Sequence, residues 1–127
     1  MKVALYARVS TEQQIDNYSI PLQRERLEAF CTSKGWTHTQ EYIDAGYSGS
    51  NLNRPALQQL QKDIQNKKIN MVIVYRLDRL SRSQRDTLYL IEEVFFPHEV
   101  EFFSLSETID TTTAFGRAAI VRPFLNV

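Results

Sequence analysis

INMVIVYRLDRLSRS, residues 69–83, joins an apolar strand to a cluster of charged side chains. Its first six residues are short, rich in β-branched types and almost wholly apolar, which is typical of a strand buried on both faces. The charged side chains that follow are Arg76, Asp78, Arg79 and Arg82. A buried strand that ends in so much fixed positive charge indicates a binding site for an anion at the edge of the core.

Strands and helices alternate outward from this stretch. The patterns predict strands over 2–10, 37–44, 69–75 and 100–106, helices over 19–35, 53–68 and 77–96, and a last helix that begins at a threonine within 111–120. Such alternation implies parallel β-α-β units, with helices on both faces of a central sheet. Ligands of these sheets bind beyond the carboxyl ends of the strands. Ser10, Asp44 and the arginine cluster all follow strand ends, so we expect them on one rim.

The composition indicates a single ordinary globular domain. Of the 127 residues, 43% are hydrophobic and 24% are charged. No apolar run approaches the roughly 18 residues of a membrane helix, and no signal-peptide pattern is present, so we expect a cytoplasmic protein without a membrane partner. The single cysteine, Cys31, excludes an internal disulfide, and the two distant histidines, His38 and His98, argue against a zinc site.

The charges are unevenly distributed although their sum is zero, and a zero sum argues against a self-sufficient DNA-binding domain. Residues 67–85 are basic apart from Asp78, and residues 92–110 contain only acidic charges. If 77–96 forms one helix ended by Pro97, its arginines lie opposite its leucines. Guanidinium groups stay protonated and match phosphate oxygens, so this face predicts a phosphate site. A plain amphipathic surface helix is the alternative.

The strand over 2–10 adds a candidate nucleophile. Side chains alternate along a strand, so Tyr6, Arg8 and Ser10 share a face, with Ser10 at the strand end. An arginine in an apolar strand is costly to bury unless it is paired or functional, and nearby cations can activate a serine hydroxyl. The alternative is a turn serine beside an arginine that reaches solvent.

Gln23, on the apolar face of the first helix, would satisfy backbone groups or orient a group of the site.

Four segments together resemble the catalytic domain of the serine site-specific recombinases, the resolvase and invertase family. They are YARVSTEQQ (6–14), DAGYSGSNLNRPAL (44–57), VYRLDRLSRS (74–83) and SLSETIDTTTAFGRA (104–118). The resemblance covers residues 1–120 in the right order and is greatest to the large serine recombinases, the integrases of phages and conjugative transposons. It implies an α/β fold: a three-layer resolvase-like catalytic domain whose mostly parallel central sheet has about four strands flanked by helices.

The resemblance also implies a reaction, in which DNA is cut and rejoined through a 5′-phosphoserine intermediate. The implied catalytic residues are Ser10 as nucleophile with Arg8, Arg54, Asp78, Arg79 and Arg82, and the supporting positions are Tyr6, Gln14, Gln23 and Ser48. Asp78 would give a proton to the leaving oxygen or hold an arginine. The arginines would supply the charge that a metal brings elsewhere, so no metal or other cofactor is implied. The implied partners are double-stranded DNA and, in a full-length protein, further copies that form dimers and tetramers.

The end of the chain departs from this family. Where the family continues into a long dimerisation helix, this sequence has AAIVRPFLNV (118–127), in which Pro123 opposes a helix. We therefore expect a catalytic domain over 1–120 and a truncated or divergent start of that helix over 121–127. Two alternatives stay open: a catalytically silent assembly module, and a small phosphate- or nucleotide-binding α/β protein. The second lacks a GxGxxG or GxxxxGK motif, which argues against it.

Overall fold

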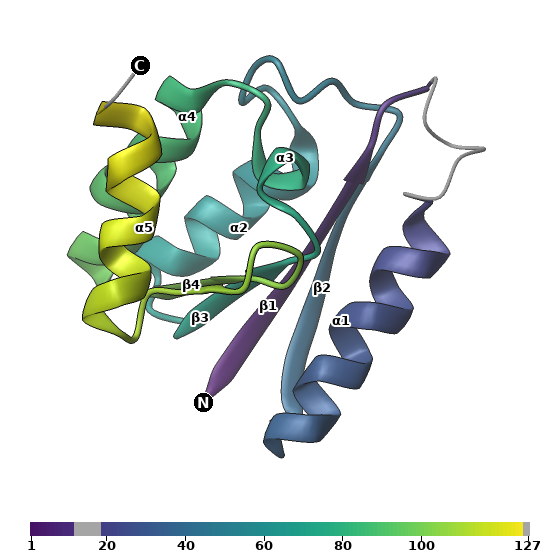
Figure 1. Cartoon of the computed structure of the whole chain (residues 1–127). Helices are drawn as coiled ribbons and strands as arrows, with labels where there is room; N and C mark the ends of the chain where they lie inside the picture. Colours follow the sequence, from purple (N-terminus) through teal and green to yellow (C-terminus); the bar gives the residue numbers. More distant parts are fainter. Residues whose placement is uncertain (12–18, 126–127) are drawn as a thin grey trace.

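A central sheet organises the molecule. The computed structural model describes residues 1–11 and 19–125, with side chains described as far as residue 120. The sheet has five strands in the order β2-β1-β3-β4-β5 (Figure 1). Their bounds are β1 Lys2–Val9, β2 His38–Ala45, β3 Met71–Val74, β4 Glu101–Ser104 and β5 Ile109–Asp110. The first four strands pair in parallel, as expected. The short β5, antiparallel to β4, was not predicted, because two residues carry no periodic pattern.

Helices cover both faces of the sheet, which confirms the three-layer α/β fold. Their bounds are α1 Ile20–Lys34, α2 Pro55–Gln65, α3 Leu77–Leu80, α4 Gln84–Tyr89 and α5 Ala114–Leu125; a π-helical turn (Leu90–Phe95) and a 3-10 turn (Phe96–His98) follow α4. Figure 1 shows α1 on one face and α2, α4 and α5 on the other. No helix in the described part of the chain is both long and apolar enough to cross a membrane.

The alternation of side chains along the strands creates two cores. Val3 and Leu5 of β1 pack with Leu27 and Cys31 of α1 on one face. Ala4 and Tyr6 of β1 point to the other face, where α2 and the turns after α4 supply the apolar cover. A strand buried on both faces has no polar side for solvent, which explains why β3 is apolar throughout.

The helix ends agree only in part with the sequence signals. Gly35 ends α1 as predicted, in a left-handed conformation (φ 74°) that a residue without Cβ adopts at little cost. At α2 the N-cap is Arg54, which makes no side-chain cap bond. The carboxylate of Asp44 serves instead, because it accepts hydrogen bonds from the backbone N–H groups of Ala56 (2.8 Å) and Leu57 (3.0 Å).

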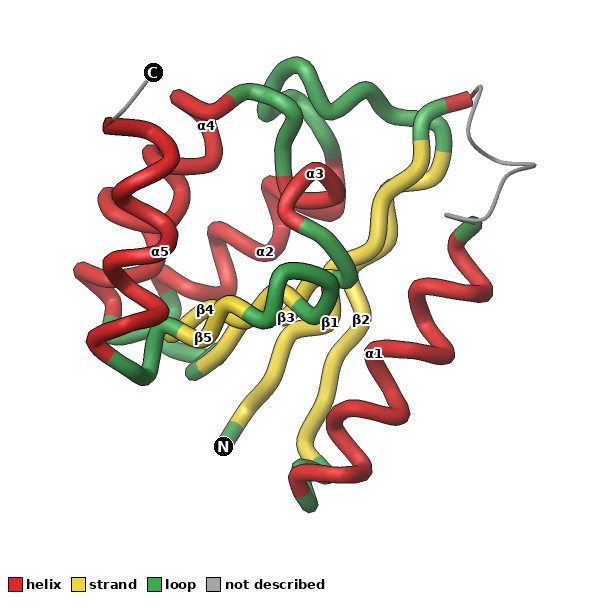
Figure 2. Tube along the Cα trace, viewed as in Figure 1, coloured by secondary structure: helices red, strands yellow, loops and turns green. Residues whose placement is uncertain are grey.

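The expected continuous helix over 77–96 is wrong. The chain leaves the helical path between α3 and α4, where Ser81 and Ser83 bond locally through the Ser81 hydroxyl (3.0 Å) and compete with helical hydrogen bonds. The loop after β2 also docks here, since the N–H of Arg82 donates to the carbonyl of Gly49 (2.8 Å). Figure 2 shows this loop passing beside the α3–α4 connection.

The last helix starts at the expected type of residue. The Thr113 hydroxyl accepts from the N–H of Gly116 (2.9 Å), which is the geometry of a threonine cap. The helix then continues through Pro123 to Leu125, so the expectation that Pro123 opposes it is wrong. A proline removes one backbone donor, and that loss weakens a helix without always ending it.

Candidate active site

The predicted rim exists at the carboxyl ends of three neighbouring strands, β2, β1 and β3. Ser10 follows β1, Asp44 lies near the end of β2, and the turn that carries Asp78 and Arg79 follows β3. In the β1–β2 register Arg8 lies directly beside Asp44. The topology therefore gathers residues that are far apart in the sequence, as parallel sheets do at this edge.

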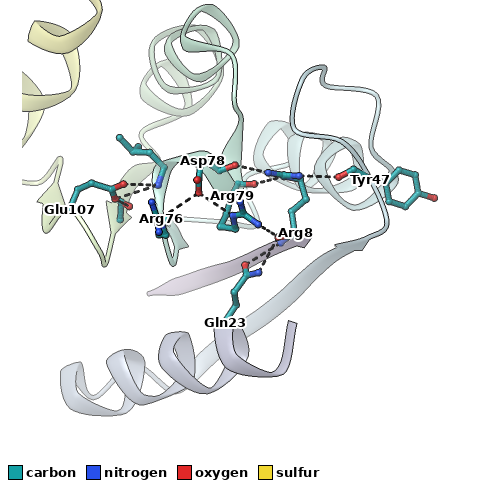
Figure 3. A network of polar contacts seen from close by, with 9 residues as sticks. Arg8, Gln23, Tyr47, Arg76, Asp78, Arg79 and Glu107 are labelled. Atoms are coloured by element: carbon teal, nitrogen blue, oxygen red, sulfur yellow. Dashed lines mark hydrogen bonds and ion pairs between the residues drawn. The ribbon is translucent and has the colours of Figure 1, made fainter. Parts of the chain in front are cut away.

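Arg8 occupies the centre of the rim and is wholly buried, with 0% of its surface exposed. Each of its three guanidinium nitrogens donates to a backbone carbonyl (Figure 3). Nε bonds to Arg79 (3.1 Å), Nη1 to Tyr47 (3.0 Å) and Nη2 to Asp78 (2.7 Å). The alternative in which this arginine reaches solvent is thus wrong, and the side chain links β1 to both neighbouring loops.

Gln23 fixes the backbone of Arg8 from α1. Its side-chain oxygen accepts from the Arg8 N–H (3.3 Å), and its side-chain nitrogen donates to the Arg8 carbonyl (3.0 Å). The same carbonyl accepts from Nη1 of Arg79 (3.2 Å). Of the two roles expected for this buried glutamine, the structure therefore shows the first, the satisfaction of backbone groups.

The side chains of the arginine segment do not all lie on one exposed face. Arg79 is only 1% exposed, and its Nε donates to Asp78 (3.0 Å). Nε of Arg76 lies 3.7 Å from the same Asp78 oxygen. Arg82 is exposed. The exposed position expected for Arg79 is wrong because its side chain and carbonyl bond to Arg8 of β1, which a helical wheel of one segment cannot include.

A second polar network surrounds Tyr6 and Arg54. The Tyr6 hydroxyl donates to Asp44 (2.7 Å) and accepts from Nη1 of Arg54 (2.9 Å). Burial raises the pKa of Tyr6 above its ordinary value, so it stays a neutral donor. Nη2 of Arg54 is buried and meets no hydrogen-bond partner within the described residues. A buried guanidinium nitrogen with an unused donor favours an anionic ligand.

Like charges crowd the rim. Burial, followed by the positive charges of Arg79 and Arg54, lowers the pKa of Arg8 to about 10, and Arg82 acts in the same direction. Tyr6 opposes this shift. A bound anion such as a phosphate would relieve the repulsion between these guanidinium groups.

These features agree with the comparison to known families, in which the model described as "Resolvase, N terminal domain" matches residues 3–122. The chain belongs to this family. The resemblance found in the sequence is thereby confirmed for the catalytic-domain part of the serine recombinases.

Solved and curated resolvase-family proteins are similar over most of this chain. The N-terminal catalytic domain of TP901-1 integrase is 48% identical, with a TM-score of 0.89 over 94% of this chain and 89% of its own. A "Putative DNA recombinase" of Bacillus subtilis is 41% identical over 72% of this chain and 18% of its own length. "DNA-invertase hin" of Salmonella typhimurium is 35% identical over 88% of this chain and 52% of its own length. The chain thus spans about half of the invertase.

The remaining site predictions have separate outcomes in this resolvase domain. Ser10 is half-buried at the end of β1. Ser48 is exposed, and its hydroxyl pairs with that of Ser50 (2.8 Å) rather than with the arginines. Gln14 lies outside the described residues. Sequence reasoning placed Asp44 on the rim but did not count it as a site residue, although a carboxylate between a strand end and a glycine-containing loop was a usable signal.

Gly49 is the other site residue that the sequence did not reveal. A Cβ at this position would lie 2.7 Å from Nη2 and 2.8 Å from Cζ of Arg8. We expect Gly49→Ala to lower the free energy of unfolding by about 1–3 kcal/mol, because the guanidinium is held by three carbonyls and cannot withdraw freely. Urea unfolding measures the change, and Ser50→Ala in the same loop is the control. Equal stability of the two variants would contradict close packing of Arg8 on this loop.

Proposed function

We propose that this chain is the catalytic domain of a serine recombinase that cleaves and rejoins DNA through a 5′-phosphoserine intermediate. The observation that carries the proposal is the group of mutually repelling arginines at the end of β1, next to Ser10. The proposed catalytic domain covers residues 1–120, and α5, which begins within it at Ala114, would lead into the truncated or divergent start of the dimerisation helix. The family match does not favour a silent assembly module or a general phosphate-binding protein.

The proposed chemistry is a phosphoryl transfer without a metal. The Ser10 hydroxyl oxygen would attack the phosphorus of a DNA phosphodiester and lose its proton. The bond to the 3′ oxygen would break, and that oxygen would gain a proton and leave as a hydroxyl. Arg79, Arg82 and Arg54 would stabilise the negative charge on the phosphoryl oxygens, and an arrangement of charges fixed before the reaction is the most effective kind.

Of the two roles expected for Asp78, its contacts favour holding an arginine over giving a proton to the leaving oxygen. Its carboxylate accepts from Arg79 and faces Arg76, so it fixes the guanidinium that would meet the phosphate. Arg8 has a related role in the present arrangement, because its three nitrogens bond to carbonyls on both sides of the site. Tyr6 and Gln23 then support Arg54 and Arg8.

The proposed partners are double-stranded DNA and further copies of the full-length protein. The net charge of this chain is zero, so most affinity for DNA would come from other contacts of the assembled recombinase. A test of function must therefore hold the chain close to its DNA substrate by other means. Fusion of the chain to a sequence-specific DNA-binding domain does so by raising the local DNA concentration.

The experiment traps the covalent intermediate. The chain and the fusion are each incubated with duplexes that carry the fusion's binding site beside a randomised, nicked segment. A nick close to the cleaved bond lets the short fragment diffuse away, so the linkage cannot be resealed. We expect an adduct that survives denaturation, at least with the fusion. A fusion that binds its site and forms no adduct would count against the proposal.

Phosphate binding to the rim gives a further expected result. Sodium phosphate should raise the melting temperature more than chloride at equal ionic strength, because an anion relieves the repulsion around Arg8. At ten times the dissociation constant the gain is about 1.4 kcal/mol, or several degrees for a domain of this size.

Two matched variants localise this effect. Arg79→Gln removes a rim cation and should lose most of the phosphate gain. Arg24→Gln removes a cation from α1 that pairs with Glu41, away from the rim, and should keep it. Scanning calorimetry measures all three proteins. Equal gains in both variants would place phosphate binding somewhere other than the rim.

A further inference from the structure

Glu107 contacts α3, the short helix that carries Asp78 and Arg79, from a part of the chain that the proposed chemistry does not use. It lies in the turn between β4 and β5. Its two carboxylate oxygens accept from the backbone N–H of Leu77, the first residue of α3, at 3.3 and 3.2 Å. Figure 3 shows Glu107 on one side of the 76–79 segment and Arg8 on the other.

The short helix α3 needs such support. It has four residues, and a single helical turn is unstable in isolation because few hydrogen bonds offset the loss of backbone freedom. Asp78 and Arg79 are its second and third residues. A bond to its first N–H group therefore fixes the start of the turn that carries both side chains.

Glu107 is itself anchored to the rigid sheet. The hydroxyl of Ser104, the last residue of β4, donates to the Glu107 carboxylate in a short hydrogen bond. Ser104 has 0% of its surface exposed and pairs with Val74 of β3 and Ile109 of β5. The position of this carboxylate is thus set by three neighbouring strands.

The turn around Glu107 is closely fitted to the end of β3. Backbone N–H groups of Leu105 and Ser106 donate to the carbonyls of Val74 (3.1 Å) and Tyr75 (2.9 Å). Thr108 has φ 54°, a left-handed conformation that is unfavourable for a β-branched residue. Such strain persists only where the surrounding contacts impose it, which indicates that the turn is tightly constrained where it presents Glu107.

A shift of α3 would reach Arg8 directly. The carbonyls of Asp78 and Arg79 accept two of the three guanidinium bonds of Arg8, and Nη1 of Arg79 donates to the Arg8 carbonyl. Freeing the first N–H of α3 would therefore loosen both buried arginines. A misplacement of about 1 Å can slow a reaction on the order of a hundredfold.

We propose that Glu107, anchored by Ser104, is a positioning residue that holds α3 so that Arg79 and Arg8 keep their places beside Ser10. This proposal rests on the proposed recombinase function for its kinetic consequence, whereas its structural consequence is independent of it.

The test compares four proteins: the unmodified chain, Glu107→Ala, Glu107→Gln and the control Glu93→Ala. Gln keeps an oxygen that can accept from Leu77, whereas Ala does not. Glu93 is an exposed acid in the π-helical turn, so its removal changes the net charge equally. Unfolding in urea identifies any variant that loses the fold as a whole.

The first measurement is hydrogen exchange of the Leu77 amide in the isolated chain. We expect exchange at least about tenfold faster in Glu107→Ala than in Glu93→Ala, with Glu107→Gln close to the unmodified chain. Unchanged exchange of the Leu77 amide in Glu107→Ala would overturn the proposal, whether or not the chain cleaves DNA.

The second measurement is single-turnover cleavage by the DNA-binding fusion, alongside its affinity. Glu107→Ala should slow cleavage of bound DNA by about tenfold to a hundredfold with unchanged affinity, and Glu107→Gln should restore most of the rate. Equal rate defects in the Ala and Gln variants would mean that the charge of Glu107, and not its bond to Leu77, sets the cleavage rate. That result would overturn the proposal. Absence of an adduct even from the unmodified fusion would instead refute the proposed function and leave the exchange result standing.

Discussion

Replacing Ser10 with alanine is expected to abolish the covalent protein–DNA adduct while leaving the fold intact. Ser10 follows β1 directly, one residue beyond the strand and two beyond the buried Arg8. Loss of one hydroxyl from a half-buried position at a strand end removes no apolar packing, so we expect the stability to change little. Without the attacking oxygen no phosphoserine can form, so the adduct should fall below detection in the nicked-substrate assay.

The location of the adduct is as informative as its loss. Digestion of the trapped complex and mass spectrometry should place the phosphodiester remnant on Ser10. Ser33→Ala, which removes an exposed hydroxyl from the last turn of α1, is the control and should form the adduct normally. An adduct mapped to Ser48, Ser81 or Ser83 would refute the assignment of the nucleophile.

Replacing Arg79 with lysine is expected to slow cleavage of bound DNA by roughly a hundredfold or more, on the order of 3 kcal/mol in the barrier. The planar guanidinium bonds to both Asp78 and the Arg8 carbonyl, and one compact ammonium cannot reproduce that geometry. Affinity should change little, because an interaction made mainly as charge moves to the leaving oxygen affects the rate and not the ground-state complex. Arg82→Lys should act in the same direction.

The measurement combines DNA affinity with the single-turnover rate at fixed salt, in the fusion that supplies DNA binding. Arg26→Lys, an exposed arginine on α1, keeps the same charge and should behave as the unmodified protein. If affinity collapses for Arg79→Lys while bound complexes are cleaved at the normal rate, the arginine serves binding, and its proposed catalytic role is wrong.

Local patterns were sufficient for the order of the elements and for much of the site. Strands β1, β3 and β4 follow from short apolar runs between helix signals, whereas β2 is mostly polar, and the parallel sheet follows from the alternation of strands with helices. That topology places Ser10, Asp44 and the arginine turn on one rim without any knowledge of side-chain contacts. The resemblance then gave roles to the rim residues, and the family match confirms the domain from which those roles come.

The tertiary structure alone decided how the charged groups are arranged, because these contacts join segments that the local pattern does not connect. The helix after β3 stops at Ser81 since Gly49, some thirty residues earlier, accepts bonds from Ser81 and Arg82. Arg79 is buried because Arg8 of β1 bonds to it, a contact that a helical wheel of the segment alone does not include.

The hydrogen bonds of two supporting acids could not be read from the sequence for the same reason. Asp44, near the end of β2, caps α2. Glu107, in the turn between β4 and β5, accepts from the first N–H group of α3. A carboxylate that serves a distant N–H group leaves no periodic signal in its own segment. The sequence by itself therefore determined which residues meet at the rim, and the long-range hydrogen bonds of the folded chain decided which of them hold the others in place.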